Sequence, residues 1–330
     1  MTAPSIQPEP KRDRYGRYLL PDPGQPGATS TLAWTRATTF AKSISDTFGL
    51  TKWQLRMALK GLTMRPDLFA RVSAATVDDR QVLDQVAEAA KEAAASSSGA
   101  NLGSALHQFT ERLDRGEQVT VPAPWDADVA AYRKVLTEAG IEVNAEWIER
   151  IIVVRQYHIA GTLDRILHSP TWRLPRIGDL KTGKDLSYGW LEIAVQEAIY
   201  ANADAMWNGL TGQYEPMPEV DREVGVVIHL PVGKATATLY EVDLVAGWEI
   251  AQVCATVRGL RTRRDLARAM PAPKTSSALL LSLIQRATGE PEMDRLWADH
   301  SANWTTQHTT AAKARLAALS TTNQTVHTNP

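Results

Sequence analysis

Apolar residues recur every three or four positions from residue 31 to residue 98, which is the spacing of amphipathic helices. Phe40, Ile44 and Phe48 show this spacing clearly. Residues 1–30 lack it and hold six prolines among scattered charges, so they cannot bury enough apolar surface to offset their ordering entropy. We therefore predict a flexible Pro-rich arm over 1–30 and a helical N-terminal region over 31–98.

Segments rich in Val and Ile begin near residue 142 and are separated by short connections, which is typical of strands. A helical pattern interrupts them over 189–209 and returns over 245–269. We therefore predict an α/β core over 99–270, followed by a small helical appendage and tail over 271–330. The predicted strands are 142–154, 157–167, 176–180, 223–230 and 235–243.

The composition excludes several classes of protein. The 330 residues carry a net charge of −1, so the chain as a whole is not a polyanion binder. The single cysteine, Cys254, rules out a disulfide framework, a four-cysteine zinc site and a four-cysteine iron–sulfur cluster. The longest apolar run, 278–284, is far shorter than the roughly 20 residues of a membrane span, and no apolar signal core is present near the first residues. We expect neither secretion nor a membrane partner.

Three charged residues lie in the predicted strands, where packing alone would not place them. Asp179 and Lys181 are two positions apart, so in a strand they point to the same face. If the segment that holds Asp164 pairs beside them, two carboxylates and one ammonium converge. Carboxylates at close range repel unless a cation joins them, and Mg²⁺ prefers such oxygen ligands. The set is suited to metal-assisted attack on a phosphodiester, although each residue taken alone is more typical of a surface ion pair.

The order of short motifs along the chain is more informative than any one of them. The motifs are Gly103-x-x-x-His107, Gly161-Thr-Leu-Asp164, Asp179-Leu-Lys181-Thr-Gly183-Lys184 and Gln196-x-x-x-Tyr200. Gln196 and Tyr200 are four positions apart and share one helix face. Together these motifs resemble those of the PD-(D/E)XK nuclease superfamily, and most of all its RecB-like and Cas4-like exonuclease branch. The resemblance covers about residues 100–245.

The resemblance implies a restriction-endonuclease-like core, with a mixed central sheet flanked by helices, and metal-dependent hydrolysis of DNA. Lys181 would orient the attacking water, while Gln196 and Tyr200 would brace the site or contact the nucleic acid. The implied ligands of Mg²⁺ or Mn²⁺ are His107, Asp164, Asp179 and the main-chain carbonyl of Leu180. The iron–sulfur cluster of Cas4-like proteins is excluded, because it takes four cysteines.

Glu146 is a further candidate ligand, because such nucleases often carry a carboxylate on the preceding strand. It alternates with Ile148 and Ile152, which would turn it toward the interior that Asp164 faces. An exposed strand charge is the equally weighted alternative.

A basic segment offers a surface for nucleic acid. Residues 253–275 carry a net charge of +5, and four of their arginines recur at helical spacing. Such a face either follows phosphates or is a solvated surface. Trp190, which precedes the helix of Gln196, is the best candidate among ten tryptophans for stacking on a base. The four arginines are Arg258, Arg261, Arg264 and Arg268.

These features predict a metal-dependent DNA nuclease, exonucleolytic by resemblance, that acts in recombination, repair or phage DNA processing. Recombination or repair proteins are candidate partners, and the expected location is the cytoplasm of a bacterial cell or phage-infected host. The alternative is a non-catalytic nucleic-acid-binding or adaptor protein that keeps the fold, which the intact Asp164, Asp179 and Lys181 set argues against. A restriction-type endonuclease is compatible with the same motifs.

Overall fold

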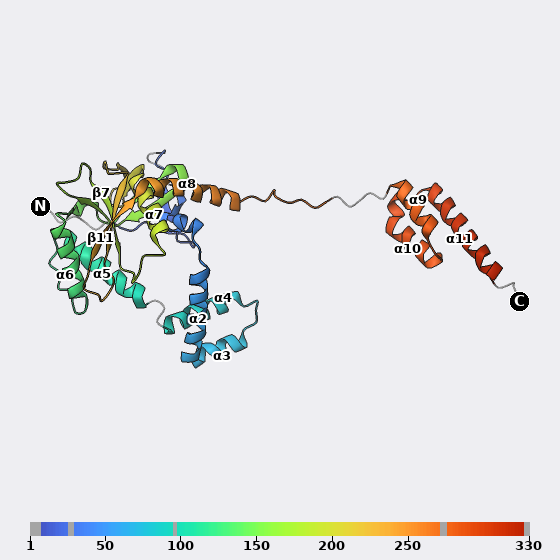
Figure 1. The fold of residues 1–330 in the computed structure, drawn as a ribbon, viewed down its shortest axis with the longest axis horizontal. Coiled ribbons are helices and arrows are strands. Elements are labelled where there is room, and N and C mark those ends of the chain that lie inside the picture. Colours follow the sequence, from blue (N-terminus) through green and yellow to red (C-terminus); the bar gives the residue numbers. More distant parts are fainter. Residues whose placement is uncertain (1–7, 26–29, 95–97, 271–275, 327–330) are drawn as a thin grey trace. The chain divides into compact units, whose positions relative to one another are not determined.

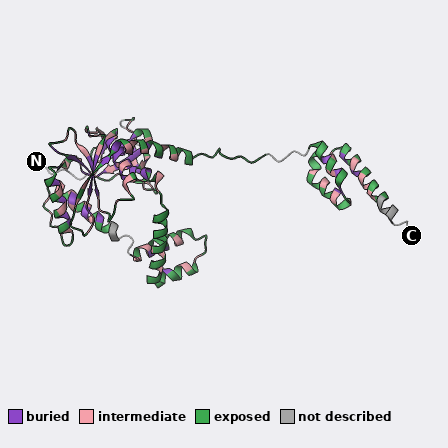
Figure 2. Ribbon diagram, in the orientation of Figure 1, coloured by how far each residue is buried: buried purple, intermediate pink, exposed green. Residues whose placement is uncertain are grey.

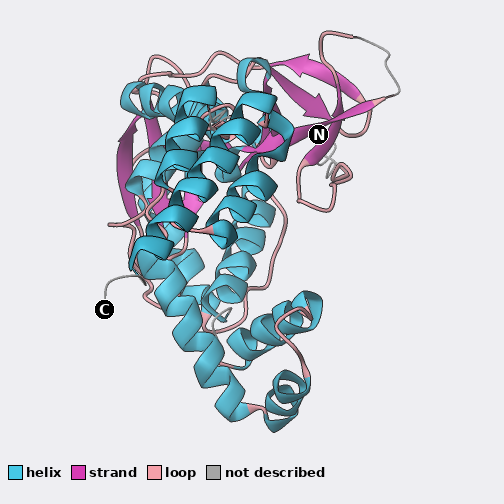
Figure 3. Ribbon diagram, turned by 90° about the vertical axis from the view of Figure 1, so that its right-hand side faces the viewer, coloured by secondary structure: helices cyan, strands magenta, loops and turns pink. Residues whose placement is uncertain are grey.

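The structure is a computed structural model that describes residues 8–25, 30–94, 98–270 and 276–326. The chain divides into two compact units, Met1–Arg263 and Arg264–Pro330, which are described separately (Figure 1). Both helices and strands are prominent in the structure (Figure 3). Within the described ranges, no helix combines the length and apolar composition that crossing a bilayer requires.

The first unit contains two mixed sheets. The six-stranded sheet has, in order, β1 (Tyr18–Pro21), β2 (Thr31–Arg36), β5 (Ile159–Leu163), β4 (Arg150–Val154), β8 (Ala205–Asn208) and β9 (Gln213–Pro216). The five-stranded sheet has, in order, β11 (Thr238–Asp243), β10 (Val224–His229), β7 (Arg176–Lys181), β6 (Arg165–His168) and β3 (Glu142–Val143). β2 and β5 are parallel, as are β10 and β7, while the other neighbours are antiparallel. The prediction of an α/β protein with mixed strand pairing is confirmed.

One predicted strand is divided between the two sheets. The pattern over 157–167 indicates a single strand, but β5 ends at Leu163 and β6 begins at Arg165 in the other sheet. Leu163 and Arg165, on the two sides of the break, are both buried, so burial continues across the break although the strand does not. Asp164 occupies the break. The strands of the predicted α/β core therefore form two mixed sheets, and Asp164 lies where the chain passes from one to the other.

The helices of the first unit are α1 (Ala37–Ala41), α2 (Phe48–Met64), α3 (Pro66–Ala74), α4 (Arg80–Ala93), α5 (Ser98–Asp114), α6 (Trp125–Glu138), α7 (Trp190–Ala201) and α8 (Leu244–Arg261). Short 3₁₀ helices are η1 (Lys42–Ile44), η2 (Ala145–Trp147) and η3 (Arg155–Tyr157). α2, α3 and α4 share a small core of their own, formed by Leu68, Val86 and Ala90. This part of the predicted helical N-terminal region is confirmed, whereas its first residues form β2.

Helices cover both faces of the five-stranded sheet. On one face α7 packs over Ile177 and Val227, and on the other α5 and α6 pack over Leu180. Successive residues of β7 alternate between these faces. Asp179 and Lys181 therefore point to the α7 side of the sheet.

The Pro-rich arm is partly ordered. β1 pairs with β2, and the side chains of Tyr18 and Leu20 are buried. A flexible arm is therefore wrong for this segment, since its partner strand supplies the burial that local composition lacks. Residues 1–7 and 26–29 of the arm lie outside the described residues.

Two predicted helices end earlier than their patterns indicate. The helix expected over 189–209 ends at Ala201, because the chain turns into β8 of the six-stranded sheet. The helix expected over 245–269 ends at Arg261, and Cys254 within it is buried. The first unit therefore ends at Arg263, before the predicted core boundary at residue 270.

The second unit is a helical bundle. It contains α9 (Ser277–Arg286), α10 (Glu290–His300), η4 (Ser301–Asn303) and α11 (Thr306–Val326). Its core is formed by Leu280, Ile284, Ala287, Met293 and Ala312. The predicted helical appendage is confirmed, and it consists of three α-helices and one 3₁₀ helix within the described residues.

A buried ion pair ties the sheet to its covering helices. Arg165 is fully buried, and its Nε lies 3.3 Å from Asp114 Oδ2. The Tyr132 hydroxyl donates to the same carboxylate at 2.7 Å, and the guanidinium of Arg165 lies 5.6 Å from the Tyr132 ring centroid. Arg165 directly follows Asp164, while Asp114 lies two turns after His107 on α5. The pair therefore sets where α5 lies relative to the break at Asp164.

Replacing Asp114→Asn should destabilise the protein by about 3–5 kcal/mol, because the substitution leaves the buried Arg165 charge without its carboxylate. Urea unfolding measures this free energy. The control is Glu138→Gln, which removes the exposed Lys134–Glu138 pair and should cost less than about 1 kcal/mol. Equal stability of Asp114→Asn and the wild type would show that the pair does not hold α5 to the sheet.

Candidate functional site

The break between the two sheets and the end of β7 form one site. Asp164 Oδ2 accepts a hydrogen bond from the Leu180 backbone N–H at 2.9 Å, across 16 residues of chain. β6 pairs beside β7, with Arg165 opposite Gly178. The predicted convergence of Asp164 with the β7 residues is therefore observed.

Asp179 and Lys181 lie together on one face of β7. Lys181 Nζ is 2.6 Å from Asp179 Oδ2, and the Asp179 side chain is only 2% exposed. Burial raises the pKa of Asp179 to about 6, a net shift that the Lys181 ammonium opposes and the neighbouring Asp164 charge supports. The Asp164 charge therefore acts on the Asp179 carboxylate at a place that is poorly accessible to water.

Gln196 and Tyr200 project from α7 onto the same carboxylate. Gln196 Nε2 donates to Asp179 Oδ1 at 3.2 Å and lies 3.1 Å from the Tyr200 hydroxyl. Tyr200 is buried, and its ring rests on Gly161, where a Cβ would lie 2.6 Å from a ring carbon. Gln196 and Tyr200 therefore both lie at the site, while their bracing role stays a prediction. The glycine of the Gly161-Thr-Leu-Asp164 motif makes room for the Tyr200 ring.

His107 reaches the site from α5. Its Nδ1 lies 3.6 Å from Asp164 Oδ2. Burial lowers the pKa of His107, while the Asp164 carboxylate and a hydrogen bond with the Leu180 backbone act in the opposite direction. Gly103, one turn earlier, allows α5 to approach this closely, since a Cβ there would lie 2.3 Å from Thr182 Oγ1. A neutral imidazole beside two oxygen donors is suited to metal ligation.

Glu146 does not join the site. It lies in η2 rather than on a strand, its side chain is exposed, and its N–H bonds to the Asn144 side chain. The predicted interior position is wrong, because the 3₁₀ turn breaks the alternation with Ile148. The carboxylate that the sequence reasoning missed is Glu149, whose N–H donates to the Asp164 carbonyl at 3.0 Å.

Glu149 and Glu111 flank the site on its outer side. They line a cavity of about 290 Å³ that extends to Thr162, two residues before Asp164. Burial raises the pKa of Glu149 to about 9, and the charges of Asp164 and Glu111 add to the shift. Glu111 lies four residues after His107, so the helical spacing of two polar residues was the available signal.

The basic face expected along one helix is not formed. α8 ends at Arg261, and Arg264 and Arg268 follow it outside any helix or strand. Arg258 Nη2 contacts Thr35 Oγ1 at 3.4 Å, and Arg261 Nη2 donates to the Ser43 carbonyl at 2.9 Å. The prediction that all four arginines lie on one helix is therefore wrong. The side chains of Arg258 and Arg261 instead connect α8 to β2 and η1.

Trp190 does not stand free for stacking. Its ring packs edge-on against Tyr240, with centroids 4.9 Å apart, and it also contacts the core beneath α7.

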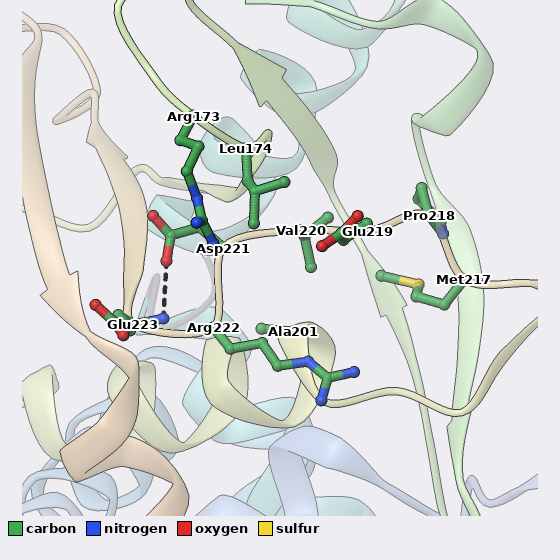
Figure 4. A pocket seen from close by; sticks show the side chains of 10 residues that line it. All are labelled: Arg173, Leu174, Ala201, Met217, Pro218, Glu219, Val220, Asp221, Arg222 and Glu223. Carbon is green, nitrogen blue, oxygen red and sulfur yellow. Dashed lines mark hydrogen bonds between the residues drawn. The ribbon is translucent and has the colours of Figure 1, made fainter.

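A cavity of about 840 Å³ lies elsewhere, between the 217–223 segment and Arg173 (Figure 4). Within it the Glu223 N–H donates to Asp221 Oδ1 at 2.8 Å. None of the predicted site residues lines this cavity.

The donors at the site are compatible with a hard divalent cation. Asp164, Asp179 and the Leu180 carbonyl are oxygen donors, and Mg²⁺ commonly takes one or two carboxylates while it keeps several waters. Among the described residues, no three His, Cys, Asp or Glu side chains are arranged to hold a metal by themselves.

Comparison with known proteins identifies no relative of this chain. No protein-family model matches the chain, and no curated protein sequence matches it.

Replacing Gly103→Ala should destabilise the protein by about 1–3 kcal/mol, because the added Cβ would collide with Thr182 and push α5 away from the site. Thermal or urea unfolding measures the loss. Gly259→Ala on α8 is the matched control: nothing lies within 4 Å of its Cβ, so it should be neutral or stabilising by about 0.5 kcal/mol. Similar effects at both glycines would contradict the close approach.

Glu149→Gln should stabilise the metal-free protein as the pH rises from 5 to 9. The unfolded chain loses the Glu149 proton near pH 4.5, while the folded protein keeps it to about pH 9, so folding of the wild type weakens across this window. We expect a stability gain of at least about 1 kcal/mol at pH 8 and none at pH 4. Unfolding in EDTA at several pH values tests this, and a difference that does not change with pH would show that folded Glu149 does not keep its proton across this window.

Proposed function

We propose that the protein is a divalent-metal-dependent DNA nuclease with a PD-(D/E)XK site in a restriction-endonuclease-like core. The observation that carries the proposal is the convergence of Asp164, Asp179 and Lys181, held by a backbone hydrogen bond and a 2.6 Å ion pair. The four motifs that resemble the RecB-like exonuclease branch supply six side chains at the site, which are His107, Asp164, Asp179, Lys181, Gln196 and Tyr200. The proposed activity is exonucleolytic, in recombination, repair or phage DNA processing.

Each group has a definite task in this proposal. Asp164, Asp179 and the Leu180 carbonyl would hold Mg²⁺ or Mn²⁺, with His107 as a further ligand. Such an ion supplies Lewis-acid stabilisation and a reactive nucleophile at neutral pH. Lys181 orients the attacking water and stabilises the negative charge that develops on the phosphate.

Gln196 and Tyr200 keep the catalytic carboxylate in place. Gln196 holds Asp179 Oδ1, which leaves Oδ2 directed to Lys181. Tyr200 in turn fixes the amide of Gln196 and closes the site from the core side. Their arrangement favours a catalytic protein over a non-catalytic adaptor, because a buried acid beside a lysine costs stability and has no evident packing purpose.

Lys181→Ala should abolish cleavage and leave Mn²⁺ binding largely intact, because an ammonium is not a ligand for a cation. Asp179→Asn should weaken both. Cleavage of end-labelled single- and double-stranded DNA with Mg²⁺, Mn²⁺ or EDTA, together with calorimetric Mn²⁺ titration, separates the two effects. Lys134→Ala, an exposed lysine of α6, is the control. Wild-type turnover of Lys181→Ala, or full cleavage in EDTA, would refute the proposed mechanism.

A further inference from the structure

One helix of the first unit has a one-sided charge that the proposed site does not use. α2 spans 17 residues and contains Lys52, Arg56 and Lys60 but no Asp or Glu. Spacings of four residues place the three cations along one side of the helix, over a rise of about 12 Å.

This side faces away from the rest of the helical subdomain, which consists of α2, α3 and α4. The opposite side packs on α4, where a Cβ on Gly61 would lie 1.7 Å from the Ala90 carbonyl oxygen. Met57 and Leu62 are partly buried near this contact, whereas Lys52, Arg56 and Lys60 are exposed. Figure 2 shows α2 largely in the colour of exposed residues.

Exposed apolar and aromatic side chains flank the three cations. Phe48 is 66% exposed, Leu55 61% and Leu59 57%, and helical spacing places them on one flank. Trp53, 39% exposed, lies on the other flank. Lys52 Nζ lies 4.9 Å from the Phe48 ring centroid, so cation and ring already share one surface. A helix surface this apolar is unusual unless something binds to it.

The cations of α2 are not neutralised within the protein. In the part of the chain that the structure describes, no ion pair involves Lys52, Arg56 or Lys60, whereas Arg65 just after the helix pairs with Asp67 at 2.7 Å. The positive potential along α2 is therefore available to an external anion.

The position of α2 in the chain connects it to the site. The helical subdomain is inserted between η1 and α5, and α5 carries His107. On the entering side, α1 packs against β5, where the Ala37 Cβ would contact a Cβ on Gly161 at 2.9 Å. The insertion is thus bounded by two elements that build the site.

We propose that this surface of α2, formed by Lys52, Arg56, Lys60, Phe48 and Trp53, binds the single-stranded nucleic acid on which the site acts. Cations in a row match successive phosphates, and neighbouring exposed rings match unpaired bases, whose faces are free to stack. A duplex offers the phosphates but not the base faces. The inference deepens the proposed nuclease function and rests on it for the nature of the substrate.

Two variants separate the phosphate contacts from the base contacts. In Lys52→Gln/Arg56→Gln/Lys60→Gln, the slope of log affinity against log salt should become shallower by up to about 2, at about 0.7 for each lost phosphate contact. Trp53→Ala should lower affinity about tenfold at unchanged salt slope, as loss of one stacked base does. Arg133→Gln/Lys134→Gln/Lys234→Gln removes the same charge from exposed positions elsewhere in the unit and should change neither quantity.

Fluorescence anisotropy with labelled oligothymidylate of about 20 nucleotides measures these effects, in EDTA and with every variant in an Asp179→Asn background to prevent digestion. Oligouridylate in a parallel arm distinguishes DNA from RNA, and circular dichroism confirms folding. An unchanged salt slope for the triple variant, tighter binding of a duplex, or loss of binding only to phosphatidylserine vesicles would each overturn the proposal. A wild type that binds through α2 but cleaves nothing would refute the nuclease function and support this surface.

Discussion

The buried pair of Arg165 and Asp114 is the constraint on which the arrangement of the site depends. A guanidinium with no exposed surface must keep its carboxylate, so α5 cannot shift along the sheet without leaving a charge unpaired. Since His107 lies two turns before Asp114, this contact also sets the distance from the imidazole to Asp164. Gly103 completes the constraint by letting the same helix lie against Thr182.

The site brings together charges that do not stabilise one another fully. Burial raises the pKa of Asp179, and it raises that of Glu149 much further. The Lys181 ammonium offsets only part of the rise in the pKa of Asp179, to which repulsion from the Asp164 charge contributes. Groups of this kind cluster where a protein performs chemistry, because folding alone would favour apolar residues in their place. A divalent cation between the carboxylates would relieve the same repulsion, which links the electrostatics of the site to the proposed metal dependence.

The proposed catalytic residues and the proposed substrate-binding surface lie in separate parts of the first unit. The carboxylates sit at the junction of two sheets, where backbone hydrogen bonds hold them in place. α2 lies in a helical insertion with a small core, and its cations are exposed. The arginines at the end of α8 serve the fold instead, since Arg258 and Arg261 bond to the segment that leads into α2. Rigid placement of the reacting groups and an adaptable binding surface are different physical demands.

The sequence by itself determined the α/β class, the β7 geometry and the order of the site residues, because these follow from local spacing: Asp179 and Lys181 share a strand face whatever surrounds them. Tertiary structure alone decided that Asp164 lies at a break between two sheets, that Glu149 rather than Glu146 faces it, and that α8 stops at Arg261. The break at Asp164 depends on strands distant in the chain, since β5 pairs in one sheet and β6 in the other. A periodic pattern records that a residue is buried, but it does not record which surface buries it.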